Sequence, residues 1–534
     1  MRTVWAVARH TLLRALRQKT APILILLVIF TGPGLSLFLE GDLQLAGLIK
    51  TVLTFNIAIV SVALMFLTLY LSTGVLHSDI AGKQIFLLDT KPIPRWQTLA
   101  GIWLGIVILL AWLLLLAGVG CYLAVLAFAS AGRWTVWGWA REIFFWILAT
   151  GLALGALALA YGWVRRRRPA ARAGWWLAAG VLALALGAWG LASGVRGTPR
   201  RLDTRGQDAI NVWRQLLIAR RSHRPPIPDI AKAVADRRRQ LEAQGADFSD
   251  WKQKELEGQL LADVAKNTWR IPYGASYSFS FTGMPRESPS ATEFMVRYKF
   301  HQLRAGGQGG GFGMAGWELR GGSDAAMMGQ RLGAFKSGRP EEFVADYALL
   351  AGTGRLDVTI HNLGEMDTGR PATFFIPLSD GLELLAPAGT FAGNLAKAYA
   401  LLWIRLAMLT VFGLFANTFM GGPVSAFFLF AAICVGQFNT AVLKSILPEQ
   451  VEGLPEAEVP RGMEILYSAA RLTMGVIPNF DRTDPTEDLL AGREITWWHI
   501  LRRLLFDLGV RGGLAAAAGC LLYARREVGL PTYV

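Results

Sequence analysis

The sequence predicts a mostly α-helical, polytopic membrane protein of about eight transmembrane helices, with one α+β domain inserted between two membrane blocks. Three observations predict this class. Of the 534 residues, 53% are hydrophobic and only 17% are charged, whereas soluble domains average roughly 25% charged residues. The mean hydropathy is +0.36. Long apolar runs lie toward both ends of the chain and enclose a more polar segment, residues 196–397.

A membrane-spanning helix needs about 20 mostly apolar residues, and eight stretches of the sequence meet this requirement. The first contains Pro33 between two glycines, which predicts a kink. The last contains Asp507 and Arg511, one helical turn apart on one face. The eight stretches are 21–39, 51–75, 99–128, 143–164, 174–195, 398–418, 424–443 and 504–523.

Basic residues are distributed unevenly among the short loops, and this bias predicts the orientation. With eight spans, all the strongly basic short segments fall on one side of the membrane. The opposite short loops, 40–50 and 129–142, hold only Lys50, Arg133 and Arg141. We therefore expect a multi-pass protein of the bacterial plasma membrane with both termini in the cytoplasm. The same asymmetry accounts for the net charge of +15 without a nucleic-acid partner. The basic segments are residues 1–19, 77–96, 165–172 and 525–526.

The N-terminal segment, residues 1–19, has the pattern of an amphipathic helix that lies in the inner membrane interface. A cytosolic extension of the first span is the alternative. One face of the helix would contain Val4, Trp5, Ala8, Leu12, Ala15 and Leu16. The other face would contain Arg2, Arg9, His10, Arg14 and Arg17.

Residues 196–397 form the inserted domain, which separates an N-terminal block (1–195, the interfacial helix and about five spans) from a C-terminal block (398–534, about three spans). Helices are expected after PPIP (225–228) and from Ser249. The hydrophobic period then changes to two, as in YSFSF, TEFMVRYKFH and LDVTI, which predicts an antiparallel, β-sandwich-like part. The span count makes this domain extracytoplasmic, because long domains cross a membrane largely regardless of charge. The residues of the alternating apolar face include Phe294, Val296, Tyr298 and Phe300.

The sequence contains no signature of an enzyme or of a metal site. It has no P-loop, no HExxH and no GxSxG, and its three cysteines, Cys121, Cys434 and Cys520, have no metal-binding spacing. The segment GFGMAG (311–316) matches G-x-G-x-x-G, but no helix is expected after it, so a turn between strands is the preferred interpretation. We expect a non-catalytic chain that binds no metal and no cofactor.

Three ionisable residues lie within predicted spans and are functional candidates for that reason: Arg405, Asp507 and Arg511. The positions of the spans predict that all three lie toward the outer side of the membrane. In the structural alternative, Arg405 extends outward to the membrane surface and Asp507 pairs with Arg511.

The loop HSDIAGKQIFLLDTKPIPRW (77–96) is too elaborate for a plain turn. A helix could run from Ser78 to about Asp89, Pro92 would end it, and Pro94 would begin the next span. Such a short cytoplasmic helix, joined to two spans, could transmit a push from a soluble partner into the membrane. A simple interfacial connector is the alternative.

This loop and the start of the following span resemble the corresponding segment of bacterial ABC-2-type transporter permeases. The sequence departs from the family pattern at Asp79, where Glu is commoner, and at Ile102, where Lys is usual. The tail LLYARREVGLP, the turn GGPVSAFF and the N-terminal amphipathic helix also resemble this family. The matching positions are Asp79, Lys83, Gln84, Leu87, Leu88, Pro92, Ile93, Arg95, Gly101 and Gly105.

The resemblance implies a permease subunit of an ATP-driven transporter, with export as the expected direction. A separate ATP-binding subunit would bind ATP and Mg and dock on the cytoplasmic helix, and a second permease copy would complete a homodimer or heterodimer. A membrane-anchored extracytoplasmic binding or sensory protein and a secondary transporter are the alternatives. The residues expected to couple the ATPase are Ser78, Asp79, Lys83, Gln84, Pro92 and Arg95.

Overall fold

The structure is a computed structural model in which the chain divides into two compact units. We call them the helical unit (Met1–Ile218, Thr390–Thr440 and Arg471–Val534) and the β unit (Ala219–Gly389 and Ala441–Ala470). The residues described are 2–17, 45–81, 94–130, 218–226, 230–245, 269–284, 293–304, 307–308, 311–321, 328–350, 354–366, 371–378, 381–446 and 484–525. The predicted spans 21–39, 143–164 and 174–195, the helix expected from Ser249, and the positions Lys83, Gln84 and Pro92 lie outside them.

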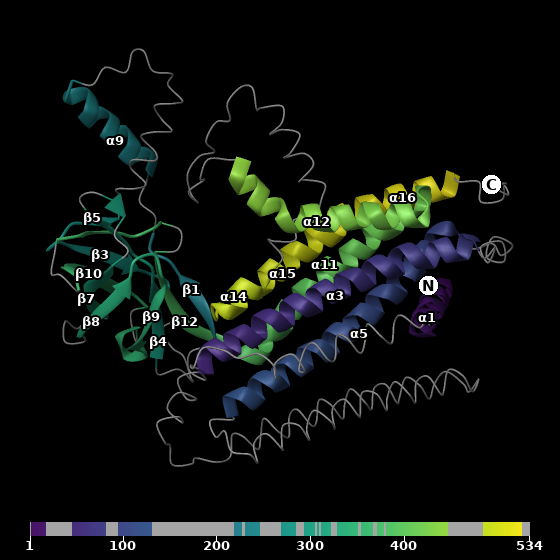
Figure 1. Ribbon diagram of the computed structural model, residues 1–534, viewed down its shortest axis with the longest axis horizontal. Helices are drawn as coiled ribbons and strands as arrows, with labels where there is room; N and C mark the ends of the chain where they lie inside the picture. Colours follow the sequence, from purple (N-terminus) through teal and green to yellow (C-terminus); the bar gives the residue numbers. More distant parts are fainter. Residues whose placement is uncertain are drawn as a thin grey trace. The chain divides into compact units, whose positions relative to one another are not determined.

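Long helices dominate the helical unit (Figure 1). In chain order, the described helices of this unit are α1 (Arg2–Arg17), α3 (Leu45–Ala81), α5 (Arg95–Ser130), α11 (Phe391–Phe419), α12 (Gly422–Ile446), α14 (Thr486–Leu490), α15 (Trp497–Arg503), the π-helical segment η5 (Leu504–Gly512) and α16 (Gly513–Arg525).

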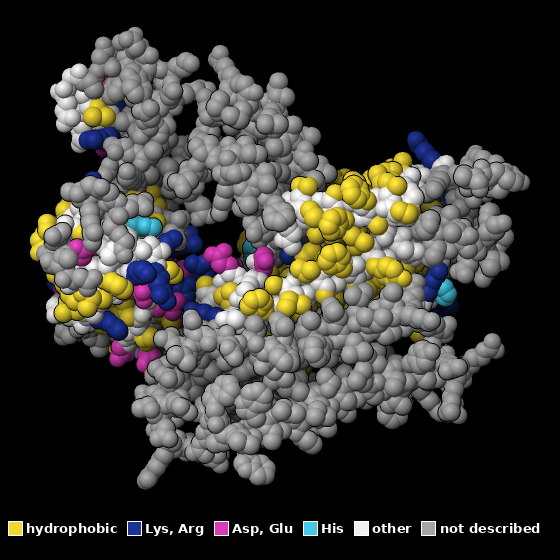
Figure 2. Space-filling view, viewed as in Figure 1, with side chains coloured by type: hydrophobic (Ala, Val, Ile, Leu, Met, Phe, Trp, Pro, Cys, Tyr) yellow, Lys and Arg dark blue, Asp and Glu magenta, His cyan; other side chains and the backbone are white. Residues whose placement is uncertain are grey.

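Within the described residues, four helical segments are long and apolar enough to cross a membrane. They overlap the predicted spans 51–75, 99–128, 398–418 and 504–523. The predicted span 424–443 lies in α12, whose described apolar part is the shorter stretch Gly422–Gln437. Figure 2 shows hydrophobic side chains gathered over the face that α12 and α16 occupy, as expected for helices that face lipid. The four segments are Ile49–Val75, Arg95–Tyr122, Phe391–Phe419 and Trp497–Arg525.

The central helix of this unit is α11, which packs against α3, α5, η5 and α16. It approaches α3 closely at Gly413, where an added Cβ would lie 2.7 Å from Cβ of Ser72. Two reciprocal hydrogen bonds join it to α5: Trp103 Nε1 donates to the Ala407 carbonyl at 3.1 Å, and Trp403 Nε1 donates to the Val107 carbonyl at 3.3 Å. Small residues and cross-helix hydrogen bonds are the usual means of joining helices in lipid.

Two spans begin earlier than their hydropathy predicts. Helix α11 begins at Phe391 with Thr390 as its N-cap, and α15 begins at Trp497 with Thr496 as its N-cap. The first turns contain polar residues that lower the local hydropathy, although capping and pairing stabilise them. As a consequence, Arg405 and Arg511 are the central residues of 29-residue segments. The prediction that they lie toward the outer side stays a prediction.

The described residues of the β unit form three four-stranded sheets, ordered β1-β12-β4-β9, β3-β10-β7-β8 and β2-β11-β5-β6. Every pairing with a printed register is antiparallel, as the alternating pattern predicts. The elements are β1 (Ile218–His223), α9 (Ile230–Ala243), β2 (Arg270–Ile271), β3 (Ser276–Phe281), β4 (Glu293–Tyr298), β5 (His301–Arg304), β6 (Gly307–Gln308), β7 (Phe312–Gly321), β8 (Met328–Lys336), β9 (Glu341–Asp346), η2 (Tyr347–Leu350), β10 (Leu356–Glu365), β11 (Thr373–Phe375) and β12 (Leu382–Thr390).

An aromatic core holds the sheets of the β unit together. Phe294, Val296, Tyr298 and Phe300, the predicted apolar face, are all at most 4% exposed. Their rings meet those of other strands, for example Phe300 and Trp317 at 5.6 Å between centroids. Aromatic pairs of this kind add to the stability that burial of their area provides. The helix predicted after PPIP is α9.

Residues 312–316 of the segment GFGMAG belong to strand β7, so the prediction of a turn between strands was wrong. The glycine at 313 is needed for packing, because a Cβ there would lie 2.7 Å from Cε1 of Phe335 on the adjacent strand. Two of the glycines in this segment therefore form part of a sheet, and they are unrelated to a nucleotide-binding loop.

Candidate functional site

The Gly-x-x-x-Gly pair at the start of α5 is where α1 docks. A Cβ at Gly101 would lie 2.6 Å from Cβ of Val7, and a Cβ at Gly105 would lie 2.6 Å from the carbonyl oxygen of Ala8. The two glycines therefore allow the backbones of α1 and α5 to approach closely. The resemblance identified these glycines, and the structure assigns them a packing partner.

The buried face of α1 differs from the predicted apolar face. Ala8, Thr11 and Ala15 are each at most 2% exposed, whereas Trp5 is 59% exposed. Ala8 and Thr11 pack against Gly105, whereas Gly101 faces the half-buried Val7. Trp5 remains available to the membrane interface, where tryptophan is enriched.

Arg95, the first residue of α5, binds the C-terminal end of α16. Its Nη1 donates to the carbonyl oxygens of Tyr523 at 2.7 Å and Ala524 at 3.3 Å. Its guanidinium carbon lies 5.5 Å from the centroid of the Tyr523 ring. A cation at this position satisfies carbonyls that have no partner within the helix and interacts favourably with the helix dipole. The first residue of one span is thereby fastened to the last turn of another.

Ser78 and Asp79 continue α3, which runs without a break from Leu45 to Ala81. The prediction that a separate helix begins at Ser78 was wrong, because nothing in the sequence between Leu71 and Ala81 ends the helix. Lys83, Gln84 and Pro92 lie outside the described residues. The chain is described again from Pro94, whose carbonyl accepts from the Gln97 amide at 2.9 Å in the first turn of α5.

The contacts of Gly101, Gly105 and Arg95 join α1 and the last turn of α16 to the start of α5. In addition, Asn417 Nδ2 donates to the Thr73 carbonyl at 2.7 Å and so joins α11 to α3. Helix α3, which precedes segment 82–93, is thus joined to α11, and α5, which follows this segment, is joined to α16.

Arg405 lies in the interior of the helical unit. It is 2% exposed, and its Nη2 donates to Sδ of Met65 on α3 at 3.7 Å. Gln437 of α12 contacts the same sulfur at 3.9 Å. The alternative in which Arg405 extends outward was therefore wrong. A charged residue at the centre of a bilayer costs about 2.5–3.5 kcal/mol on insertion scales, so Arg405 remains a candidate functional residue.

Asp507 lies between two arginines on the last span. Arg511 Nη1 binds its Oδ1 at 2.9 Å, and Arg503 Nη1 approaches its Oδ2 at 3.5 Å. The Asp507 side chain is 5% exposed, whereas those of Arg503 and Arg511 are 22% and 31% exposed. The predicted pair is confirmed, and Arg503 was missed although it has the same four-residue spacing. Both Asp507 and Arg511 lie in η5, and short π-helical segments occur frequently at functional sites.

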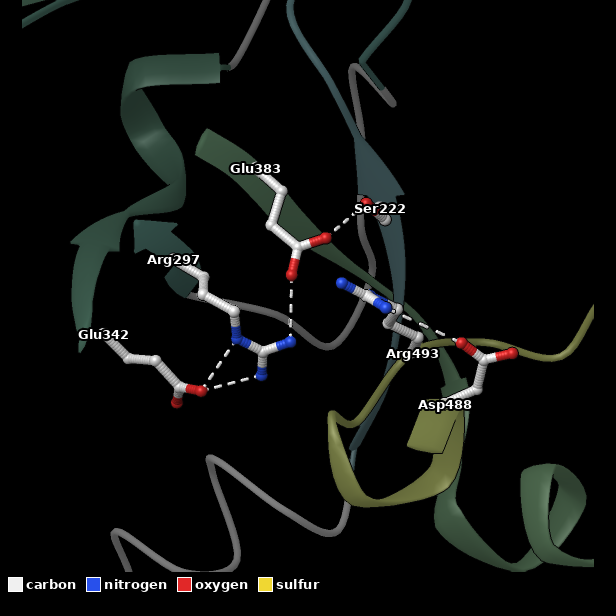
Figure 3. A network of polar contacts seen from close by, with 6 residues as sticks. All are labelled: Ser222, Arg297, Glu342, Glu383, Asp488 and Arg493. Atoms are coloured by element: carbon white, nitrogen blue, oxygen red, sulfur yellow. Dashed lines mark hydrogen bonds and ion pairs between the residues drawn. The ribbon is translucent and has the colours of Figure 1, made fainter. Parts of the chain in front are cut away.

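The opposite end of α11 is fastened to the segment before α15. The Asn394 side chain donates to the Arg493 carbonyl at 2.7 Å and accepts from the Ile495 amide at 2.8 Å. Lys397 binds Glu494 at 3.0 Å, and both side chains are 12% exposed. Arg493 in turn approaches Asp488 at 3.8 Å (Figure 3). These contacts explain why the polar first turn of α11 belongs to the helix.

In the β unit, Arg297 on β4 lies between two carboxylates (Figure 3). It binds Glu342 of β9 at 2.7 Å and Glu383 of β12 at 2.9 Å, each of which is its direct cross-strand partner. The Ser222 hydroxyl donates to Glu383 at 2.8 Å. Burial lowers the pKa of the nearby Arg220 to about 10, partly offset by the charge of Glu342. The sequence pattern did not identify this network.

Within the residues that the structure describes, no group of three or more His, Cys, Asp or Glu side chains could hold a metal ion. The described polar contacts include buried ion pairs and the binding of Arg95 to the end of α16. The chain matches no protein-family model, and no significant match was found among characterised proteins or solved structures.

Proposed function

We propose that this chain is the membrane subunit of an ATP-driven transporter of the ABC-2 type, and that a separate ATP-binding subunit acts on segment 82–93. Export is the expected direction. ATP and Mg would be bound by the partner, and a second permease copy would complete the transport pathway. The β unit would lie on the extracytoplasmic side.

The observation that carries the proposal is the contact of Arg95 with the Tyr523 and Ala524 carbonyls. Segment 82–93 follows directly from the end of α3 and leads through Pro94 into Arg95. A force applied to it would therefore act on α3, on α5 and, through Arg95, on α16. The docking of α1 on Gly101 and Gly105 would carry the same movement to the membrane interface. A simple connector between two spans would not need hydrogen bonds from Arg95 to the C-terminal end of α16.

The test is site-specific cross-linking in cells. A photo-reactive amino acid at Lys83 or Gln84 is expected to capture an ATP-hydrolysing protein, identified by mass spectrometry after solubilisation in mild detergent. The same amino acid at Trp498, an exposed residue at the start of the last span, is the matched control and should not capture it. If neither coupling position captures a nucleotide-hydrolysing partner, the proposal is wrong.

A second arm tests coupling itself. Replacement of Asp79 or Arg95 by Ala is expected to uncouple ATP hydrolysis from transport while the chain remains inserted. For Arg95 the reason is the loss of its hydrogen bonds to the Tyr523 and Ala524 carbonyls of α16. Unchanged transport, together with unchanged binding of the ATPase in both variants, would contradict the coupling role.

A further inference from the structure

The middle of the long apolar segment Trp497–Arg525 contains a partly exposed arginine. Arg511 is the central residue of the 29-residue segment Trp497–Arg525, with fourteen residues on either side. At 1.5 Å per residue, it lies about 21 Å from each end, whereas the hydrocarbon core of a bilayer is about 30 Å thick. Its side chain is nonetheless 31% exposed. An arginine at this depth is too far from either surface to place its guanidinium among the headgroups.

The neighbours of Arg511 on the same helix distinguish its environment from lipid. Val510 and Leu514, on adjacent positions, are 52% and 68% exposed and apolar, as expected for a lipid-facing surface. Asp507, one turn before Arg511, is 3% exposed and faces inward. The exposed part of the guanidinium therefore belongs to a boundary between the lipid-facing side and the packed side of the helix.

The charge at this boundary is positive. The Asp507 carboxylate contacts both Arg503 and Arg511. Residues 502–511 contain three arginines and one aspartate, a formal charge of 3 − 1 = +2. A guanidinium group recognises carboxylate and phosphate by paired hydrogen bonds, and binding of this kind is strongest where water is scarce.

We propose that Arg511, held in place by Asp507 in the π-helical middle of the last span, borders a water-accessible passage and binds the phosphate or carboxylate group of a molecule that enters it. Asp507 and Arg503 are positioning residues, because they contact Arg511 or its carboxylate partner. The π-helical segment places an extra residue in the turn, which allows Asp507 to face inward while Arg511 reaches the boundary. The inference requires that Trp497–Arg525 spans the bilayer, but it does not require a partner ATPase.

The first test asks whether water reaches Arg511. Arg511→Cys and Val510→Cys are compared in membranes with a charged, membrane-impermeant thiol reagent, and the parent chain with its three native cysteines supplies the background. Labelling of Arg511→Cys well above background, with Val510→Cys at background, is expected. Equal labelling of the two positions, or no labelling of either, overturns the passage.

The second test asks whether the site binds an anion. The full chain is placed in phosphatidylcholine nanodiscs, and its unfolding temperature is measured against inorganic phosphate, with chloride at equal ionic strength as the reference. A saturable rise is expected, because a ligand that binds only the folded state stabilises it. Arg511→Gln should weaken the response about tenfold or more, since a hydrogen bond to a charged group contributes about 1.5–3 kcal/mol and 1.4 kcal/mol is tenfold in affinity.

Three further arms keep the result decisive. Arg502→Gln, an exposed neighbour, should respond like the parent chain. Asp507→Asn should respond at lower phosphate concentration, because it removes the competing negative charge, even though the variant is less stable. If Arg511→Gln does not fold, Arg511→Lys replaces it, and an intermediate response is expected.

A rise in unfolding temperature only in nanodiscs that contain phosphatidylglycerol, and only when Arg511 is present, would assign the anion to a lipid headgroup. The absence of any Arg511-dependent rise in both kinds of nanodisc overturns the anion site. No ATPase enters either test. Failure of the anion site would therefore leave the proposed transport function standing, and failure of the transport proposal would leave the anion site standing.

Discussion

The two units contain charge clusters of opposite design. In the β unit one arginine, Arg297, lies between the carboxylates of Glu342 and Glu383. In the helical unit one carboxylate, Asp507, lies between the guanidinium groups of Arg503 and Arg511. The first cluster joins three strands, whereas the second lies along a single helix.

The difference concerns what each cluster stabilises. Arg297 is 11% exposed and Glu383 is 3% exposed, so their pairing holds β4, β12 and β9 in register and leaves little of either charge at the surface. In the helical cluster only the central Asp507 is buried, and the outer arginines keep part of their surface. We infer that the first cluster serves the fold, whereas the second leaves part of the Arg511 guanidinium group accessible.

The largest expected effect is the removal of Arg297. Arg297→Met should destabilise the β unit by about 3–5 kcal/mol, because the buried carboxylate of Glu383 loses its counter-charge. Hydrogen exchange of the full chain, measured by mass spectrometry on peptides from β4, β9 and β12, checks this. The double variant Arg297→Met with Glu383→Leu should recover most of the loss. If the single variant costs less than about 1 kcal/mol, which is the size of an exposed pair, the structural role of this cluster is wrong.

A smaller effect is expected in the helical unit. Asp507→Leu should destabilise the last span by about 2 kcal/mol, because it removes the carboxylate that binds the partly exposed guanidinium group of Arg511. The readout is hydrogen exchange in peptides from residues 497–525. Arg502→Leu, which changes an exposed neighbour of similar size, is the control. A cost as large as that of Arg297→Met would remove the distinction between the two clusters.

The comparison also shows what could be read from the sequence. Asp507 and Arg511 were predicted as a pair because both lie on one helix at a spacing of four. Arg503 has the same spacing but was missed, since it lies before the predicted start of the span at residue 504. The start was placed there because Arg502 and Arg503 lower the hydropathy of the first turns.

The contacts of Arg297 and Arg95 were beyond the reach of local patterns. Arg297 is 45 residues from Glu342 and 86 from Glu383, and only the register of β4 with its neighbours brings them together. Arg95 is 428 residues from Tyr523. By contrast, the alternating face of β4 and the helix α9 were predicted, because each depends on its own short stretch of sequence. The alternation identifies which residues are buried, but it does not identify the neighbouring strand.

Within the β cluster, the exposure of each carboxylate should decide its importance. Glu383→Gln is expected to cost about 1–3 kcal/mol, because its side chain is 3% exposed and its charge is matched to Arg297. Glu342→Gln should cost less than about 1 kcal/mol, because its side chain is 26% exposed. The two variants have the same chemistry, so each is the control for the other. Equal costs in the hydrogen-exchange measurement would show that exposure does not govern this network.

The smallest expected effect is a pH dependence at the edge of the same sheet. Burial, and then the charge of Arg221, lower the pKa of His223 on β1 below its usual value of 6.5. The folded state therefore binds fewer protons than the unfolded state just below pH 6.5, so stability present above that pH is lost as the pH falls through the folded-state pKa. Unfolding temperatures of the full chain at pH 7.5 and pH 5.5 check this, and His223→Gln should reduce the difference slightly. A decrease that persists in full in His223→Gln would assign the pH dependence to another group and would contradict the role of His223.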